Sequence, residues 1–389
     1  MRMNNLSAEI GYQSLIHHGE QLCGDHVDVV ESDNSTVIVL ADGLGSGVKA
    51  SILSTLTSKI ISTMLAAELS LVNAVETIAA TLPICSERNE AFSTFTIIRL
   101  ENGNHADIIQ YENPNVIMIR DGESVDYPLN PALIGGKTVY RSSIEVQDGD
   151  IFIAMSDGVL YASPDGVYNE KWNLEGVADY IAPLLVTGFS AKTIASIILD
   201  ETNRLYGGKP FDDATVCAVK IRQREPVNIA IGPPRRRDDN QRMMSLFFGK
   251  EGRHIVSGGT TASIAAEYLH EPVHLSYTSP DPDIPPISEI NGVSLVTEGI
   301  ITMDRVLAYA KDYLEDNSTF EQWGYKKDGA SQIARMLFEE ATDINMFIGH
   351  AENPAHSDLP INFNVKMSIL TQLADCLRKM GKRVKVLDF

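Results

Sequence analysis

The sequence predicts two domains of different fold class, an α+β layered sandwich followed by an α/β domain with a parallel sheet. In the first part of the chain, strands and helices come in separate groups, which is typical of α+β folds. After a change of pattern between Arg222 and Pro226, strands and helices alternate, which favours a parallel sheet. The chain of 389 residues is long enough for two domains, which we expect at 1–224 and 225–389.

The first domain is expected to open with a strand pair and a helix pair. The stretch 35–41 is β-branched and apolar, as a buried strand should be, and helix-spaced Ala, Leu and Ile residues follow from Val48. Dipeptides such as Asp121-Gly122 favour tight hairpin turns between later strands. The expected elements are strands at 24–31, 35–41, 92–100, 106–111, 116–120, 143–146, 151–155 and 214–221, and helices at 48–68, 71–82, 174–185 and 191–205.

The second domain is expected to alternate strand and helix from its first residues onward. Apolar runs of strand length are each followed by apolar residues at helical spacing. The expected strands are 227–231, 254–256, 293–297, 344–348 and 384–387, and the expected helices are 239–248, 261–269, 303–314, 331–341 and 367–380.

The chain is strongly acidic, with a net charge of −20 from 32 basic and 52 acidic side chains. This excess argues against nucleic acid or an anionic membrane as the main partner, whereas divalent cations are compatible with it. The four cysteines form no CxxC pair, so neither a zinc knuckle nor a disulfide framework is indicated. The N-terminus has no signal-peptide pattern and no apolar run is long enough to span a bilayer. We therefore expect a cytoplasmic protein.

Acidic residues stand where predicted strands end or begin, at Asp25, Asp42, Asp157 and the pair Asp212-Asp213. Hard divalent ions such as Mg²⁺ and Mn²⁺ prefer oxygen ligands, and two such ions can clamp a phosphoryl oxygen and activate a water molecule. An isolated Asp-Gly dipeptide is usually only a turn. The functional interpretation therefore depends on the ordered set rather than on any one member.

The ordered set resembles a known family. The motifs that carry the resemblance are Gly24-Asp25, Ala41-Asp42-Gly43-Leu44-Gly45-Ser46-Gly47, Asn113-Pro114, Ser156-Asp157-Gly158-Val159 and Asp212-Asp213-Ala214-Thr215-Val216. Their order and rough spacing are similar to those of stage II sporulation protein E-type phosphatases, the compact bacterial branch of protein phosphatase 2C. The resemblance covers roughly residues 10–222.

The resemblance implies an α-β-β-α sandwich that binds two Mn²⁺ or Mg²⁺ ions and hydrolyses phosphoserine or phosphothreonine in a phosphorylated protein substrate. The water bridging the two ions would be the nucleophile, and Asp42, Asp157 and Asp212 would be the catalytic side chains. By motif position, the metal-site residues are Asp42 as the bridging ligand, the Gly43 carbonyl on one ion, Asp157 and Asp212 on the other, and Asp25 through water or as a support. Asp213 completes the set and stands where many relatives have Asn.

The sequence also departs from the family pattern near Asp42. Leu44 stands where many eukaryotic members have His, and Ser46 where the bacterial branch often has His. A counterpart of the phosphate-binding Arg of the eukaryotic members is also not evident. The alternative interpretation is thus a catalytically weak or inactive phosphatase-fold scaffold or regulatory binding protein. The nearby histidines are His17, His18 and His26. A single His near a strand is more often a packed or surface residue than a catalytic one. The sequence does not determine the oligomeric state and is compatible with a homodimer.

The second domain contains one suggestive local feature, Ser257-Gly258-Gly259-Thr260-Thr261, between a predicted strand and a predicted helix. Backbone N–H groups at a helix start, together with Thr hydroxyls, suit a small anionic ligand that would regulate the phosphatase. Glycine for the turn and threonine as the N-cap explain the same residues without a ligand. The stretches 296–300 and 348–354 also fall at strand ends, where ligands of parallel sheets bind.

Overall fold

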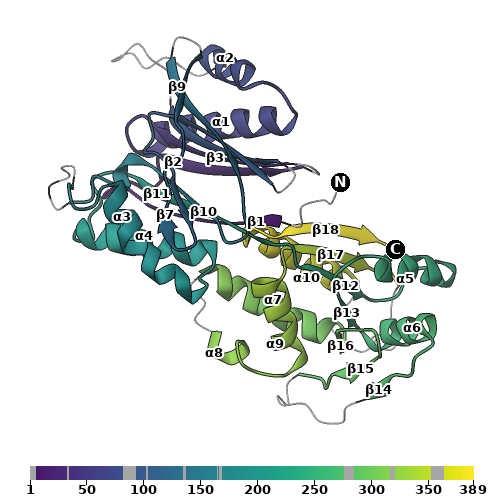
Figure 1. Cartoon of the computed structure of the whole chain (residues 1–389). Helices are drawn as coiled ribbons and strands as arrows, with labels where there is room; N and C mark the ends of the chain where they lie inside the picture. Colours follow the sequence, from purple (N-terminus) through teal and green to yellow (C-terminus); the bar gives the residue numbers. More distant parts are fainter. Residues whose placement is uncertain are drawn as a thin grey trace. The chain divides into compact units, whose positions relative to one another are not determined.

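The computed structural model describes residues 6–32, 35–81, 93–101, 104–134, 137–163, 165, 169–275, 284–315, 320–351 and 363–389. The chain divides into two compact units, Met1–Gln223 and Arg224–Phe389 (Figure 1). Parts of three expected segments, residues 82, 92 and 352–354, lie outside the described residues. None of the described helices combines the length and the apolar character needed to cross a membrane.

The first unit contains two antiparallel sheets. The six-stranded sheet has the order β2 (Asp25–Glu31), β3 (Ser35–Gly43), β4 (Ser93–Glu101), β5 (His105–Tyr111), β9 (Lys137–Glu145), β8 (Asn130–Ile134). The five-stranded sheet has the order β1 (Leu6–Leu15), β11 (Ala214–Gln223), β10 (Ile151–Met155), β6 (Ile117–Arg120), β7 (Glu123–Ser124). Between β6 and β7, Asp121 and Gly122 have φ of 53° and 82°, as the hairpin turn predicted at this dipeptide requires.

Helices cover the outer face of each sheet. α1 (Gly47–Ala66) and α2 (Leu71–Thr81) pack on the six-stranded sheet, whereas α3 (Leu174–Ile181), α4 (Ala191–Leu205) and the 3-10 segment Ala182–Thr187 pack on the five-stranded one. Successive residues of β3 point to opposite faces, so Val37 and Val39 contact the helix layer while Ile38 and Leu40 join the core between the sheets. The predicted α-β-β-α sandwich is confirmed.

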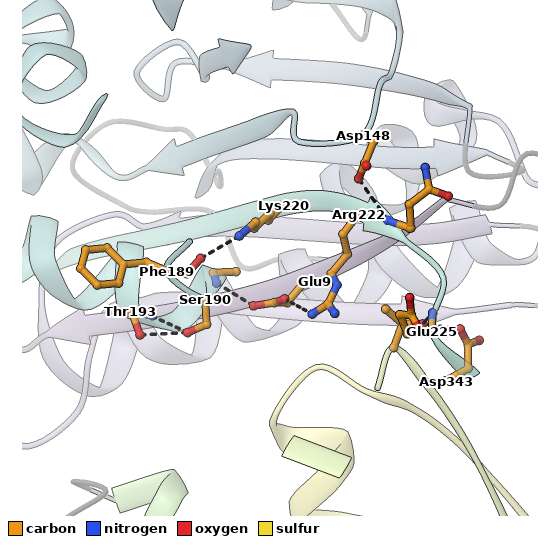
Figure 2. Close-up of polar contacts among 12 residues, drawn as sticks. Glu9, Asp148, Phe189, Ser190, Thr193, Lys220, Arg222, Glu225 and Asp343 are labelled. Atoms are coloured by element: carbon orange, nitrogen blue, oxygen red, sulfur yellow. Dashed lines mark hydrogen bonds and ion pairs between the residues drawn. The ribbon is translucent and has the colours of Figure 1, made fainter. Parts of the chain in front are cut away.

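The first strand, β1, was not predicted from the sequence. It pairs antiparallel with β11 from Leu6 to Leu15. Figure 2 shows how its Glu9 carboxylate accepts hydrogen bonds from Ala191 N, at the start of α4, and from Arg222 Nη1, both at 2.8 Å. A carboxylate at a helix N-terminus is stabilising, so β1 also fixes the position of α4.

The second unit has a seven-stranded sheet, which confirms the α/β prediction. Its parallel part has the order β16 (Leu295–Thr297), β13 (Arg253–Ser257), β12 (Pro226–Ile231), β17 (Asp343–Ile348), β18 (Arg383–Asp388). Two short antiparallel strands at the β16 edge, β15 (Ser288–Glu289) and β14 (His274–Leu275), were not predicted. Short edge strands carry too little pattern to be recognised from sequence alone.

Helices cover both faces of this sheet. α5 (Asn240–Phe248) and α6 (Gly259–Leu269) pack with Ala230 and Val256 on one face. The other face, with Ile229 and Ile255, is covered by α7 (Ile300–Glu315), α8 (Phe320–Trp323), α9 (Gly329–Ala334), the π-helical turn Arg335–Glu340 and α10 (Phe363–Lys379). The predicted helix 331–341 is therefore real, but its second half is π-helical.

Candidate metal centre

Two of the predicted metal ligands lie on neighbouring strands of the six-stranded sheet. Asp25 begins β2, Asp42 lies near the end of β3, and the two residues are directly opposite each other in the antiparallel pair. A hydrogen bond from Gly43 N to Gly24 O, 3.1 Å long, extends the pairing by one step. The strand that the sequence predicted at 35–41 thus delivers Asp42 to the edge of the sandwich, next to Asp25.

Ser156 joins this pair to the five-stranded sheet. Its hydroxyl donates to Asp25 Oδ2 at 2.7 Å and accepts from Thr215 N at 2.8 Å, while Ser156 N donates to Thr215 O at 3.0 Å. Ser156 follows β10 and Thr215 lies near the start of β11. The same hydroxyl therefore links both sheets at the end where the acidic residues gather.

Asp157 and Asp212 are brought together by a close backbone approach. Asp157 opens the 3-10 turn Asp157–Val159, and a Cβ added at Gly158 would lie 2.1 Å from Asp213 O. Only glycine allows this contact between the turn and the segment before β11. The Tyr206 hydroxyl donates to Gly158 O at 2.6 Å and so helps to hold the turn in place.

Asp213, next to Asp212 in the chain, is 2% exposed. Its Oδ1 accepts a hydrogen bond from His17 N at 3.0 Å. A Cβ added at Gly24 would lie 2.7 Å from Asp213 Oδ2, so the glycine of Gly24-Asp25 makes room for this carboxylate. Asp213 is therefore positioned by His17, which follows β1, and by Gly24, which precedes β2.

The carboxylates affect one another electrostatically. Burial raises the pKa of Asp25 to about 7, with a further contribution from Asp213 and Asp212. Burial raises the pKa of Asp42 well above its usual value, and Asp25, Asp157 and Asp212 add to the increase. Burial also raises the pKa of Asp212 to about 6, with Asp157 as the next cause. Such mutual effects require neighbouring carboxylates, so the predicted acidic set converges on one place.

The donor set fits a divalent cation in its chemistry. Asp25 Oδ1 and Asp213 Oδ2 are buried and have no hydrogen-bond partner. Buried carboxylate oxygens without a partner are costly, and cations such as Mg²⁺ bind oxygen ligands of this kind. Within the described ranges, however, no three His, Cys, Asp or Glu side chains are placed so that they could hold a metal ion together. The assignment of individual ligands, the Gly43 carbonyl included, is therefore a proposal.

Residues flanking the centre have other contacts. His26 Nδ1 lies 2.8 Å from Ser58 Oγ, and burial lowers the pKa of His26, so this residue packs against α1. Ser46 Oγ donates to Glu20 Oε1 at 3.4 Å. Leu44 is 39% exposed beside them.

Sequence reasoning missed the positioning roles of His17 and Tyr206. Tyr206 carries no local signal, since only the fold brings it to Gly158. Ser156 was part of a recognised motif, but its link to Asp25 could not be inferred before β2 and β10 were placed. The predicted anion-site residues Gly258, Gly259, Thr260 and Thr261 lie at the start of α6, in the second unit.

Comparison with known proteins adds a family match. Residues 32–222 match the family described as Stage II sporulation protein E (SpoIIE). A search of curated proteins found no match.

Three solved structures are among those similar to this chain. The phosphatase domain of SpoIIE from Bacillus subtilis, with a fragment of its regulatory domain, is 21% identical over 57% of this chain and 65% of that chain, with a TM-score of 0.46. The RsbU and RsbW domains of a Mycobacterium tuberculosis protein are 14% identical over 83% and 79% of the two chains, with a TM-score of 0.49. RsbX in complex with magnesium is 20% identical over 55% and 95%, with a TM-score of 0.40.

Proposed function

Because residues 32–222 match the family described as Stage II sporulation protein E, we propose that this chain is a metal-dependent protein serine/threonine phosphatase. Its substrate would be phosphoserine or phosphothreonine in a phosphorylated protein. Its cofactor would be a pair of Mn²⁺ or Mg²⁺ ions bound by Asp42, the Gly43 carbonyl, Asp157 and Asp212, with Asp25 and Asp213 completing the site. Asp42, Asp157 and Asp212 would be the catalytic side chains.

One observation carries this proposal. Burial raises the pKa of Asp42, and three of these carboxylates, Asp25, Asp157 and Asp212, lie close enough to Asp42 to raise it further. A cluster of buried like charges is unfavourable unless cations neutralise it. Two divalent ions supply the missing positive charge and, when bound, polarise the phosphoryl group and activate water.

The surrounding residues of the chain would hold the metal ligands in place and orient their oxygen atoms. The cross-strand pair Asp25 and Asp42 fixes two carboxylates on rigid strands, where their spacing cannot drift. Ser156 orients Asp25 by donating to Oδ2, which leaves the partnerless Oδ1 free to face a cation or its water. Tyr206 holds Gly158 in place and through it the neighbouring Asp157.

An inactive binding scaffold is the second candidate, and it too has an observation in its favour. Where relatives place His near the metal site, this chain has Leu44, which is 39% exposed, and Ser46, whose hydroxyl donates to Glu20. Neither Leu44 nor Ser46 can donate a proton to a leaving group as imidazolium does. Slow turnover with normal metal binding would agree with this candidate.

The experiment that separates the candidates is hydrolysis of a phosphoserine peptide in Mn²⁺ by the full chain. The proposal predicts turnover that requires Mn²⁺ and falls at least about 100-fold in Asp42→Asn, the loss typical of removing a group that stabilises the transition state. Asp121→Asn is the matched control, because Asp121 is an exposed turn residue followed by glycine. Wild-type turnover no faster than that of Asp42→Asn, with Mn²⁺ binding retained, would establish the scaffold instead.

A further inference from the structure

Two loops of the second unit meet at the carboxyl ends of neighbouring parallel strands. β13 leads into α6 through Gly258, and the adjacent β16 leads into α7 through Glu298 and Gly299. Gly258 N donates to Thr297 O at 2.8 Å, and Ser257 Oγ donates to Glu298 O at 2.9 Å. The carboxyl ends of parallel strands face the same edge, so both helices begin side by side at that edge.

The two helices begin in the same way. Gly258 is the N-cap of α6 and Thr261 is the third helical residue, while Gly299 precedes α7 and Thr302 is its third residue. Gly258 has φ of 114°, a conformation that favours glycine. A Cβ added at Gly299 would lie 3.6 Å from Gly258 Cα. The backbones of the two helix starts therefore lie close to each other, and only the positive φ of Gly258 requires glycine.

Polar groups at this place lack partners. Thr261 is 0% and Thr302 1% exposed, and the hydroxyl oxygens of both, with that of Thr297, are buried without a hydrogen-bond partner. Thr261 Oγ1 points toward the cap, 3.3 Å from the place of a Cβ on Gly258. A buried hydroxyl without a partner is costly, and the first N–H groups of a helix have no partner within the helix. The buried hydroxyls and the first helix N–H groups can therefore both donate hydrogen bonds to an acceptor on a bound ligand.

A carboxylate of the chain itself, that of Glu298, lies near the start of α6. The Glu298 carboxylate oxygens are 3.9 Å from the position of a Cβ on Gly259. Glu298, Gly259 and Thr260 are exposed, so this side chain is free to turn away and a solute can reach the helix start. A helix N-terminus favours negative charge, so an external anion would compete with this carboxylate.

We propose that the paired starts of α6 and α7 form a phosphate-binding site, occupied by inorganic phosphate or by the phosphate group of a small phosphate monoester. The N–H groups of Gly259, Thr260 and Thr261 and the Thr261 and Thr302 hydroxyls are its donors. A tetrahedral phosphate offers several acceptor oxygens at once, which a single carboxylate such as Glu298 does not. The site lies in the second unit, whereas the carboxylate cluster lies in the first.

The test is calorimetric titration of the full chain with inorganic phosphate and, separately, with adenosine monophosphate. An Asp42→Asn background with EDTA removes binding at the carboxylate cluster, so the result is independent of the proposed phosphatase activity. We expect saturable binding of at least one ligand. Equal affinities identify inorganic phosphate as the source, and tighter binding of the nucleotide identifies the monoester.

Three substitutions make the test specific. Thr261→Val, which keeps the shape and removes the hydroxyl, should weaken binding about tenfold without lowering the melting temperature of the free chain. Glu298→Gln should strengthen binding severalfold, because the competing charge is gone. Ser263→Ala is the control on the same helix, since its hydroxyl already donates to Gly259 O. No saturable binding by the background protein, or unchanged binding by Thr261→Val, would overturn the proposal.

Discussion

Asp25 and Asp42 lie directly opposite each other across β2 and β3. Like charges at directly opposed positions of an antiparallel pair destabilise a sheet. Asp157 and Asp212, next to strands of the other sheet, also raise the pKa of Asp42. Because several carboxylates gather at one end of the sandwich, this end is well suited to bind cations.

The stability of the metal-free chain should decrease as the pH rises from about 4 to about 7. The pKa values of Asp25, about 7, and Asp212, about 6, lie above the value of about 4 in an unfolded chain. The folded state therefore binds more protons than the unfolded state in this window, and its stability falls as those protons leave. Because one pKa unit corresponds to about 1.4 kcal/mol, we expect a decrease of about 4–6 kcal/mol.

Urea unfolding in EDTA at a series of pH values measures this effect. The comparison is with Asp25→Asn, in which the dependence should be flatter because one titrating group is missing. Saturating Mn²⁺ should remove the loss in the wild type. An Asp25→Asn variant with the same pH dependence as the wild type would contradict the assigned pKa direction.

Ser156→Ala should lower both the affinity for Mn²⁺ and the free energy of unfolding. The substitution leaves Thr215 N without its acceptor and Asp25 Oδ2 without its donor. Loss of a partner for a buried N–H costs about 1–3 kcal/mol, and loss of a residue that orients a metal ligand costs about 10-fold or more in metal affinity. Chemical denaturation and Mn²⁺ titration measure the two effects. Ser156→Thr, which retains the hydroxyl, should recover part of the affinity, and equal affinity in the alanine and threonine variants would refute the role of Ser156.

Gly24→Ala should displace Asp213. The added methyl would lie 2.7 Å from Asp213 Oδ2 and 2.9 Å from Ala50 Cβ, so one of the contacts must give way. We expect destabilisation of about 1–3 kcal/mol, as for overpacking in a core, with weaker Mn²⁺ binding. Gly188→Ala is the control, because its Cβ meets nothing within 4 Å and only its φ of 78° is strained. Mn²⁺ affinity that is lowered as much in the control as in Gly24→Ala would show that Asp213 is not part of the site.

Tyr206→Phe should reduce activity through Gly158 rather than through contact with substrate. The lost hydrogen bond to Gly158 O is buried and 2.6 Å long. Its removal should cost about 1 kcal/mol of stability and lower kcat more than it changes KM. Steady-state kinetics with the phosphoserine peptide measure the split. A change confined to KM would place Tyr206 at the substrate instead.

The fold was largely predictable because most elements carry a strong local pattern. The β3 segment is apolar on both faces, and the helices from Val48 and from Ala191 have apolar residues at helical spacing. β1 was missed because its polar residues, such as Glu9, take partners from distant parts of the chain, on α4 and β11. The π-helical turn at Arg335–Glu340 likewise has no signature in the sequence.

The candidate sites were predictable only in part. The acidic motifs were recognised because each combines Asp with Gly at the end of a strand, but the support of Asp213 by His17 depends on strand pairing. In the second unit, Gly258 was noticed from its neighbours. About 40 residues away in the chain, Gly299 was noted only as part of the strand end 296–300, and Thr302 was not noted; neither was linked to Gly258. Only the pairing of β13 with β16 brings them together.

The central claim is that carboxylates from both sheets enclose two divalent cations at the end of the first unit. Anomalous diffraction from crystals soaked in Mn²⁺ tests it most directly. The account predicts two peaks about 3.5–4 Å apart, each about 2 Å from an oxygen of Asp42, with Asp157 and Asp212 coordinating one of them. Crystals saturated with Mn²⁺ that show no peak within coordination distance of Asp42 would contradict it.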